Sequence, residues 1–514
     1  MTPGLPPRPL RRPLRLAALL VTAALAGLTA CTGTAATDPT DNSSASGQAD
    51  TSLAVGATLE PSTLDFTASS EAAIGQVLLY NVYETLLRID QQGELQPLLA
   101  TGYTLSDDRL TYTFTLDPKA TFASGTKVDA DAVIKSIERL KPAVNTNVSA
   151  PLALVAATEA VDATTVAVTL THPSNSWLYD MASTAGIVVD PATTDLAQRP
   201  AGSGPYQFST WTRGDQITLT KNQSYWGTPA GFDEVTFRYF SDPNAMNSAE
   251  LSGGIDIISD LTSPSSLSAF ADTSQYQVID GTTTGEVVLG FNHTKPALQD
   301  RRVRQAINYA IDRQSLLDTV WGGKGLLIGS MVAPTDPYYE DLSQTYPYDP
   351  EKAKALLAEA GQENLTLALR VPVVPYATSA AQVIASMLGQ VGVTVEVSEL
   401  DFGTWYTQVF TDGDFDMTIV NHVETRDIVQ FANPGYYWHY DNADFQALIA
   451  QADEAAPDEY VPLMKQAAQL LADDAAADWL WSFPSLTVAR ADLTGIPQNS
   501  TTTSFDLTQI RSKA

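Results

Sequence analysis

The sequence predicts an α/β or α+β protein rather than a helical bundle, and three observations support this class. From residue 53 onward, short runs with apolar residues at alternate positions are followed by stretches with helical spacing. Turn signals such as Asp117-Pro118 and Gly214-Asp215 separate these runs. The chain has 514 residues, which is enough for two or three domains of roughly 100–200 residues each. We therefore expect strand–helix–strand units that build more than one lobe.

The first half of the chain contains two strands, a helix and a hairpin with clear signals. Residues 110–116 (LTYTFTL) alternate strictly, which is typical of a half-buried strand. Val133 and Ile137 fall on one helical stripe, and Asp129 is a suitable N-cap for that helix. The elements expected here are a strand at 110–116, a helix at 129–140, a strand at 166–170, and a hairpin of 208–211 with 216–220.

The second half is richer in helical patterns. Residues 301–317 (RRVRQAINYAIDRQSLL) carry an apolar stripe at helical spacing and predict a helix over that whole range. Asp349-Pro350 marks the start of another helix, which we expect to end near Gly361. A helix at 378–390 and a strand at 393–397 follow, and the polar segment 501–514 is expected to be a frayed tail.

The charge balance of the chain is strongly acidic. Lys and Arg number 29 against 59 Asp and Glu, so the formal net charge is −30. Such a surface repels phosphate backbones, which excludes general nucleic-acid binding. A single cysteine also excludes a disulfide framework and a cysteine-rich zinc module.

Sequence signals for catalysis are missing. The four histidines include no pair with the spacing of a zinc site. Gly202-Ser203-Gly204 lacks the spacing of a hydrolase nucleophile elbow, and the sequence has no phosphate-binding P-loop motif. We therefore expect no enzyme activity, no metal site and no cofactor.

The first thirty residues, 1–30, have the pattern of a secretion signal. A basic start precedes the apolar run 16–28, which is too short to span a bilayer and fits the core of a signal peptide. Leu28-Thr29-Ala30-Cys31 resembles the lipobox of bacterial lipoproteins, which implies a lipid on Cys31; the alternative is an unlipidated signal followed by a free cysteine. Residues 31–52 are small and polar and predict a flexible linker. We expect an extracytoplasmic protein anchored to the cell membrane by this lipid.

Several sequence blocks, taken together, resemble the solute-binding proteins of bacterial peptide-type ABC importers, a family that includes dipeptide, oligopeptide and nickel receptors. Each block is weak alone, but they follow the family's order between about residue 55 and residue 490. The most specific block is 300–313 (DRRVRQAINYAIDR), with Phe291-Asn292 before it. The others are 60–65 (EPSTLD), 83–87 (YETLL), 112–116 (YTFTL), 202–206 (GSGPY), 225–227 (YWG), 348–350 (YDP) and 413–416 (GDFD).

The resemblance implies an α/β, two-lobed periplasmic-binding-protein-like fold of type II, peptide-binding class, with an extra domain inserted in the first lobe. In such receptors the ligand is enclosed between the lobes, and the importer recognises the closed form. By analogy, the first lobe combines residues 53–80, 194–285 and 482–514, the inserted domain is 81–193, and the second lobe is 286–481.

The resemblance also points to residues that contact a ligand. In dipeptide receptors of the family, a carboxylate of the second lobe takes the peptide α-amine, and an arginine takes the carboxylate end. Asn421-His422-Val423-Glu424 stands at the first motif, which places Glu424 on the amine-binding position. Tyr376 matches the second segment, but Val374 stands where the arginine belongs. Either Arg426 replaces that charge or the ligand has no carboxylate there; an ion pair of Arg426 with Glu424 or Asp427 is the structural alternative.

Other candidates are aromatic or small and polar. Aromatic faces can stack on ligand side chains or sugar rings, although packing inside the second lobe explains these residues at least as well. Residues 67–70 match a small polar segment that meets the ligand backbone in the family, with a helix-capping turn as the alternative. The full set of ligand-binding candidates is Glu424, Arg426, Tyr376, Asn421, His422, Trp405, Tyr437, Trp438, Ser69 and Ser70.

Three functional hypotheses remain. The first is a peptide receptor that delivers its ligand unaltered to the permease and ATPase subunits of an ABC importer. The second is a receptor for another solute, such as a nickel complex, an opine or an oligosaccharide, which the missing arginine and the aromatic cluster at 436–440 keep open. His422 and His439 could meet in space and bind nickel. The third is an extracytoplasmic hydrolase. We expect the first, with no nucleic-acid partner, a monomeric chain, and membrane contact through the lipid on Cys31.

Overall fold

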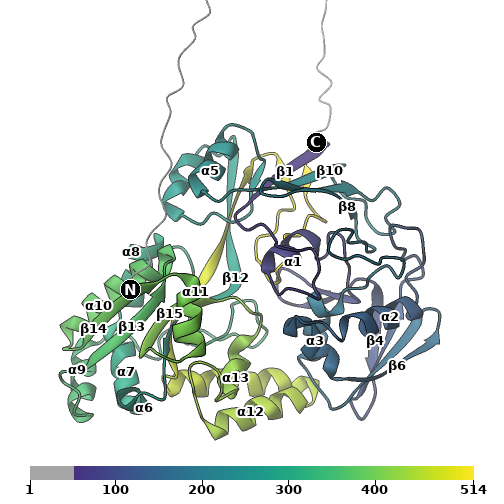
Figure 1. Ribbon diagram of the computed structural model, residues 1–514. Coiled ribbons are helices and arrows are strands. Elements are labelled where there is room, and N and C mark those ends of the chain that lie inside the picture. The colour runs from purple at the N-terminus through teal and green to yellow at the C-terminus, as the bar shows by residue number, and fades with distance from the viewer. Residues whose placement is uncertain (1–50, 514) are drawn as a thin grey trace, which may run out of the picture. The chain divides into compact units, whose positions relative to one another are not determined.

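The computed structural model describes residues 51–513, and Figure 1 shows how its elements are arranged. The signal segment 1–30, the lipidation candidate Cys31 and nearly all of the linker 31–52 lie outside the described residues. The main sheet has ten strands in the order β14-β13-β15-β12-β16-β11-β1-β10-β9-β8. A second sheet has four strands in the order β4-β5-β7-β6 and shares no strand with the main sheet.

Two long strands, β12 (Tyr276–Phe291) and β16 (Ala477–Arg490), run antiparallel through the middle of the main sheet. Near its end β16 pairs with β11 (Ile257–Ile258), whereas the end of β12 pairs with β15 (Met417–His422). The pairing of β12 with β16 is interrupted between Thr282 and Glu286. Because the same two strands belong to both sides of the sheet, this interrupted stretch is where a hinge can bend. We call the elements on the β11 side the first lobe and those on the β15 side the second lobe.

The first lobe is built around a mixed part of the main sheet. Strand β1 (Ser52–Ala57) pairs in parallel with β10 on one side and with β11 on the other. The remaining elements are β8 (Tyr206–Thr212), β9 (Gln216–Lys221), β10 (Glu234–Tyr239), α1 (Ala72–Leu78), α5 (Pro243–Leu251), the 3₁₀ helix η2 (Pro264–Phe270), and the short pair β17 (Leu493–Thr494) and β18 (Arg511–Ser512).

Residues 87–186, which we call the inserted region, carry the four-stranded sheet and belong to the first lobe by packing. Phe114 and Val168 of this sheet lie in the same buried hydrophobic cluster as Val55 and Phe237 of the main sheet. The elements are β2 (Leu87–Ile89), β3 (Leu95–Pro97), β4 (Ala100–Leu105), β5 (Thr111–Leu116), α2 (Ala130–Leu140), α3 (Thr146–Ala153), β6 (Val155–Asp162), β7 (Thr165–Leu170), α4 (Trp177–Met181) and η1 (Thr184–Gly186).

The second lobe packs hydrophobic side chains on both faces of its part of the sheet. On β12, Val287 and Leu289 join one buried cluster while Val288 joins another, as period-two alternation requires. The sheet strands are β13 (Thr366–Pro372), β14 (Thr394–Leu400) and β15. The helices are α6 (Pro296–Gln299), α7 (Arg301–Ala310), α8 (Arg313–Trp321), α9 (Pro350–Glu359), α10 (Pro375–Gln390), α11 (Phe402–Trp405), η3 (Tyr406–Thr411), η4 (Asp427–Ala432), α12 (Ala443–Glu454) and α13 (Pro457–Asp473).

Most elements that the sequence predicts are present at the expected places. The strands at 110–116 and 166–170, the helix at 129–140 and the hairpin correspond to β5, β7, α2 and the β8–β9 pair. Asp129 caps α2, since its Oδ1 accepts a hydrogen bond from Ala132 N at 2.9 Å. Gly214 in the hairpin has φ +75°, a conformation that favours glycine. The helices and strand expected after Asp349 correspond to α9, α10 and β14.

The helix predicted over 301–317 is wrong in its extent, because two helices occupy this range. Helix α7 ends at Ala310, Ile311 is extended, and α8 begins at Arg313. Asp312 starts the second helix by accepting a hydrogen bond from Ser315 N at 3.1 Å. The apolar spacing continues across the break because both helices pack against the same core.

The segment 501–514 is not the frayed tail that its polarity predicts, as far as residue 513. Thr501 and Thr502 are buried, and Asp506 forms an ion pair with Arg88. Leu507 N donates to Asn81 Oδ1 at 3.0 Å. The polar side chains find partners in the first lobe more than 400 residues earlier in the chain, which local sequence patterns do not reveal.

Candidate ligand-binding cavity

A cavity of about 680 Å³ lies between the two lobes, at the interrupted stretch of β12 and β16. The first lobe lines it with α1 and the loop before it, with α3 and α4, and with residues 497–505. The second lobe lines it with the loop after β15 and the start of η4. The volume lies within the range of about 300–1,000 Å³ that is typical of small-molecule sites. The cavity is therefore large enough to enclose a ligand of that size.

The first-lobe wall begins at the turn before α1. Ser69, Ser70 and Glu71 all line the cavity. The Glu71 carboxylate accepts hydrogen bonds from Ser62 N at 2.7 Å and from Ser69 Oγ at 3.0 Å. Burial opposes the charged form, but the hydrogen bonds from Ser62 and Ser69 together outweigh it and lower the pKa of Glu71 below its usual value. This wall therefore carries a fixed negative charge beside small hydroxyl groups.

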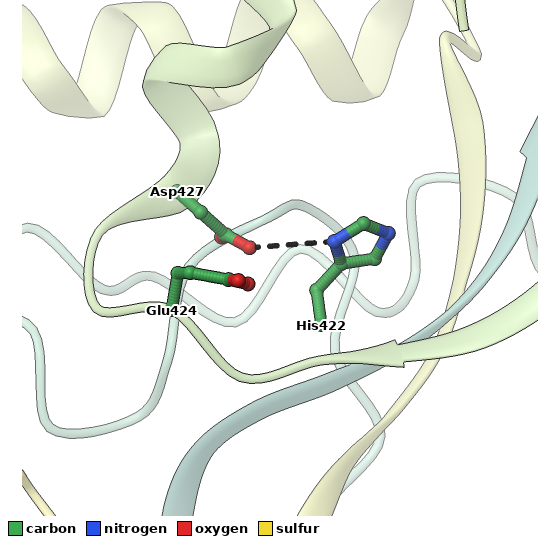
Figure 2. Close-up of side chains that lie close together, drawn as sticks. All are labelled: His422, Glu424 and Asp427. Carbon is green, nitrogen blue, oxygen red and sulfur yellow. Dashed lines mark ion pairs between the residues drawn. The ribbon is translucent and has the colours of Figure 1, made fainter. Parts of the chain in front are cut away.

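Two ionisable side chains of the second-lobe wall, Glu424 and Asp427, lie beside His422 just behind the wall, as Figure 2 shows. His422 ends β15, Glu424 lies in the following loop and Asp427 begins η4, and one nitrogen or oxygen atom of each lies within 4.8 Å of the others. His422 Nδ1 is 3.7 Å from Asp427 Oδ2, and His422 Nε2 is 2.9 Å from Tyr437 Oη. Burial lowers the pKa of His422 to about 3, so the imidazole is neutral near pH 7.

Asp427 is the least satisfied group of this wall. It is only 3% exposed, and neither carboxylate oxygen has a hydrogen-bond partner within residues 51–513. Burial, and then the charges of Glu424 and Asp336, raise the pKa of Asp427 well above its usual value. The pKa of Glu286 on β12 is also raised, by burial and by the charge of Asp427. A buried carboxylate without a partner holds a proton or receives a cation.

The chemistry open to this wall is cation binding. An imidazole with two carboxylates can ligate a divalent transition-metal ion, and His422, Glu424 and Asp427 are the residues that would hold it. The same two carboxylates can also accept hydrogen bonds from an ammonium group. Among the described residues, His439 is not part of the group of His422, Glu424 and Asp427, so the structure does not place the two histidines in one metal site.

The structure divides the ten ligand-binding candidates into two sets. Ser69, Ser70, Asn421 and Glu424 line the cavity, two on each lobe. The other six are not part of its lining, and the ligand role of all ten stays a prediction. These six are Arg426, Tyr376, His422, Trp405, Tyr437 and Trp438.

Arg426 is held by partners outside the lining. Its Nε lies 3.5 Å from Asp336 Oδ1, and its guanidinium carbon lies 3.0 Å from the centre of the Tyr179 ring. The structural alternative, an ion pair with Glu424 or Asp427, is wrong, because the partner is Asp336. Asp336 comes from a loop 90 residues earlier, which no pattern around Arg426 indicates. Tyr179 belongs to the inserted region, so this side chain joins the two lobes beside the cavity.

The aromatic candidates and Tyr376 support the second-lobe wall from behind. Tyr376 Oη accepts a hydrogen bond from Asn421 N at 2.9 Å, which fixes the backbone of a lining residue. Trp405 Nε1 donates to Thr418 Oγ1 at 3.0 Å inside the lobe. Tyr437 and Trp438 are 3% and 1% exposed and lie in the aromatic core of this lobe.

Comparison with known families identifies the chain. Residues 94–447 match the model of the bacterial extracellular solute-binding proteins, family 5 (middle part). The chain belongs to this family. The family 5 protein is 30% identical over 340 residues to the glutathione-binding protein GsiB of Salmonella paratyphi A. That match covers 64% of this chain and spans 66% of the length of the relative. The predicted family is therefore confirmed.

Solved structures confirm the predicted fold class of this family 5 protein. The ABC transporter substrate-binding protein CtaP of Listeria monocytogenes matches with a TM-score of 0.81 at 23% identity, over 91% of this chain and 100% of that one. NikA of Brucella suis, in complex with Fe(III)-EDTA, matches with a TM-score of 0.79 at 23% identity, over 90% of this chain and 100% of that one. Within residues 51–513, no helix has the length and apolarity needed to cross a membrane.

Two acidic residues of the first lobe line the cavity of the family 5 protein although no sequence motif points to them. Asp180 lies in α4, and Asp260 follows β11. Burial raises the pKa of Asp180 to about 7 and that of Asp260 to about 6. A usable signal exists only for Asp260, because ligands of α/β sheets gather at the carboxyl ends of parallel strands, and β11 runs parallel to β1.

Proposed function

We propose that this family 5 protein is the extracytoplasmic receptor of an ABC importer, that it encloses a peptide between its lobes, and that it hands the peptide over unaltered. The observation that carries this proposal is the cavity of about 680 Å³ at the interrupted stretch of β12 and β16. A cavity beside strands shared by both lobes can close over its ligand when those strands bend. Closure then excludes water and gives the permease a recognisable form.

The chemistry of the walls supports a peptide as the ligand. Glu424 has no hydrogen-bond or ion-pair partner within residues 51–513, and its carboxylate suits a peptide α-ammonium. Ser69, Ser70 and Asn421 offer hydroxyl and amide groups to a peptide backbone. The relative GsiB is named for glutathione, which is itself a peptide. NikA shares the fold and holds a metal chelate, so the fold alone does not select the ligand.

The lobe boundaries and the membrane anchor are parts of the same proposal. We assign residues 53–80, 194–285 and 482–514 to the first lobe, 81–193 to the inserted domain and 286–481 to the second lobe. The junctions 285/286 and 481/482 fall at the interrupted pairing of β12 with β16, which supports this division. The lipid on Cys31 rests on residues 28–31 of the sequence. Replacing Cys31 by serine should release the protein from the membrane fraction into the soluble fraction.

A ligand screen with a matched pair of variants tests the peptide proposal. The full chain is screened by thermal shift against short peptides, oligosaccharides and metal chelates, because a specific ligand raises the melting temperature by mass action. Glu424→Ala should weaken peptide binding about tenfold or more, as expected for loss of a charged hydrogen bond. Glu396→Ala, an exposed position on β14 of the same lobe, serves as the control and should bind like the wild type. Stabilisation by a sugar or chelate without any peptide response would contradict the proposal.

A further inference from the structure

The cavity lining contains five carboxylates and no basic side chain. Glu71, Asp180 and Asp260 come from three separate parts of the first lobe, and Glu424 and Asp427 come from the second lobe. Within residues 51–513, no lysine, arginine or histidine is part of this lining. The acids thus surround the enclosed space from both lobes rather than forming one surface cluster.

Four of these five carboxylates also receive no hydrogen bond. Only Glu71 is satisfied, by its hydrogen bonds from Ser62 and Ser69. In the described part of the chain, Asp180, Asp260, Glu424 and Asp427 accept no hydrogen bond at their carboxylates. Asp427 is the strongest case, since it is 3% exposed and neither oxygen accepts a hydrogen bond, although His422 Nδ1 lies 3.7 Å from Oδ2.

The nearest arginine does not cancel this charge. Arg426 is close enough to Asp180 to oppose the rise of its pKa, but its Nε faces Asp336 at 3.5 Å. Its guanidinium group stacks on Tyr179 outside the lining. One cation is therefore shared by Asp336 and Asp180, while the remaining acids of the wall have none. The lining therefore offers open carboxylate acceptor positions and supplies no cation of its own to fill them.

We propose that this cavity selects ligands with a net positive charge and, given the proposed peptide-binding function on which this rests, selects cationic peptides. A lysine or arginine side chain brings three or five N–H donors to carboxylates that have open acceptor positions. A ligand carboxylate would instead be buried among unpaired like charges, without a donor to satisfy it. Blocking the peptide carboxyl end should therefore help binding. By the same reasoning glutathione, which has two carboxylates and one ammonium group, should bind weakly.

Matched tripeptides test the charge preference directly. Binding of Ala-Lys-Ala, Ala-Gln-Ala, Ala-Glu-Ala and amidated Ala-Gln-Ala to the full chain is measured by calorimetry at low salt. A chelator in the buffer removes any metal ion that His422, Glu424 and Asp427 could hold. We expect the dissociation constant to rise about tenfold for each positive charge lost, in the order lysine, glutamine, glutamate. Amidation of Ala-Gln-Ala removes one negative charge and should lower its dissociation constant about tenfold.

Variants of the lining show whether the preference arises in the cavity. Asp180→Asn and Asp260→Asn should each reduce the ratio of the dissociation constant for Ala-Glu-Ala to that for Ala-Lys-Ala. The double variant should reduce this ratio further. Asp107→Asn serves as the matched control, because Asp107 is exposed in the inserted region and is not part of the lining. It should keep the wild-type ratio. An unchanged ratio in the double variant would overturn the assignment of the preference to this cavity.

The outcomes separate this inference from the proposed function. Equal binding of all four peptides would overturn the charge preference and leave the peptide receptor intact. The dication 1,5-diaminopentane is included as a ligand without a peptide backbone. If it binds and no peptide does, the charge preference holds and the peptide function falls. If neither it nor any peptide binds, both are overturned.

Discussion

Asp478 and Glu84, which are buried inside the lobes, differ from Asp427, which is buried at the cavity, in the partners of their carboxylates. Asp478 and Glu84, inside the lobes, have fixed partners, whereas Glu250 on α5 is buried without one. Asp478 on β16 lies 3.0 Å from Arg313 Nη1, although its second oxygen is left without a partner. Glu84 accepts hydrogen bonds from Tyr225 Oη at 2.6 Å and from Trp226 Nε1 at 3.0 Å. At the cavity, by contrast, Asp427 has no hydrogen-bond partner in the described structure.

Titration behaviour alone does not distinguish these settings. Burial raises the pKa of Glu84 to about 7 and that of Asp478 to about 6, and it also raises the pKa of Asp427. The difference is whether a protein group donates a hydrogen bond to the carboxylate oxygens. Asp478 and Glu84 receive hydrogen bonds from the protein, whereas Asp427 keeps its acceptor positions open at the cavity. Four predictions challenge this contrast.

The largest effect is expected when an interior acid loses its partner. Arg313→Ala leaves Asp478 buried and unpaired and also removes the donors to the carbonyls of Ser343 and Tyr346. Breaking a buried pair in this way should lower the free energy of unfolding by about 3–5 kcal/mol. Lys354→Ala removes an exposed pair with Glu351 and should cost about 0–1 kcal/mol. Urea denaturation measures both, and equal losses would break the contrast.

The second prediction concerns the pH dependence of stability at Glu84. Its folded pKa is raised from 4.5 to about 7. An acid whose pKa is higher in the folded than in the unfolded state contributes stability that is fully present below pH 4.5 and is lost as the pH rises through 7. Glu84→Gln removes this titration, so the fall in unfolding free energy between pH 5 and pH 8 should become shallower by up to about 3 kcal/mol. Urea titrations at several pH values measure the slope, and an unchanged slope would contradict the buried setting of Glu84.

The third prediction sharpens the contrast at the cavity. Asp427→Asn replaces a buried carboxyl group whose oxygens accept no hydrogen bond, so the free energy of unfolding of the empty protein at pH 8 should stay constant or rise by about 1 kcal/mol. Ligand affinity should fall about tenfold, because a charged acceptor is lost. Chemical denaturation and calorimetry give the two quantities. A loss of stability as large as that of Arg313→Ala would show that Asp427 is a structural group.

The smallest effect concerns the pH dependence of ligand binding. Asp260 and Asp180 have pKa values raised to about 6 and about 7, with Arg426 and Asp453 as the charges that face Asp180. A cationic ligand favours their ionised forms, so binding releases protons and affinity rises with pH. The affinity for Ala-Lys-Ala should increase severalfold between pH 5.5 and pH 8 and then level off. Asp180→Asn with Asp260→Asn should flatten the curve, and a fall in affinity over this range would contradict the sign.

Local patterns were sufficient for elements whose signals are also local. The alternation in β5 and the Asp129 cap of α2 depend on neighbours in the chain, and both are present as predicted. The break at Ile311 could not be predicted from apolar spacing, because one core covers both helices across it. Likewise the C-terminal segment looks disordered by composition but is held by Asn81, whose distance along the chain hides the contact.

The site was partly predictable through the family resemblance, which pointed to Glu424 and to the serines before α1. Asp180 carries no motif, and only the packing of the inserted region brings it to the cavity. Arg426 illustrates the opposite failure. Its position in the sequence suggested a carboxylate ligand, while Asp336 and Tyr179 occupy its guanidinium group. The charged residues that line a cavity come from segments that are remote in sequence. The net charge of the lining can therefore be determined only from the folded chain.

Native mass spectrometry of the full chain, purified from its own host without denaturation, would identify the ligand that the cavity encloses. An enclosed ligand should accompany the folded protein and dissociate on acid unfolding. We expect an intact peptide that carries more basic than acidic groups. A bound sugar or metal chelate in its place, or fragments of a cleaved peptide, would contradict a receptor that captures peptides and releases them unaltered.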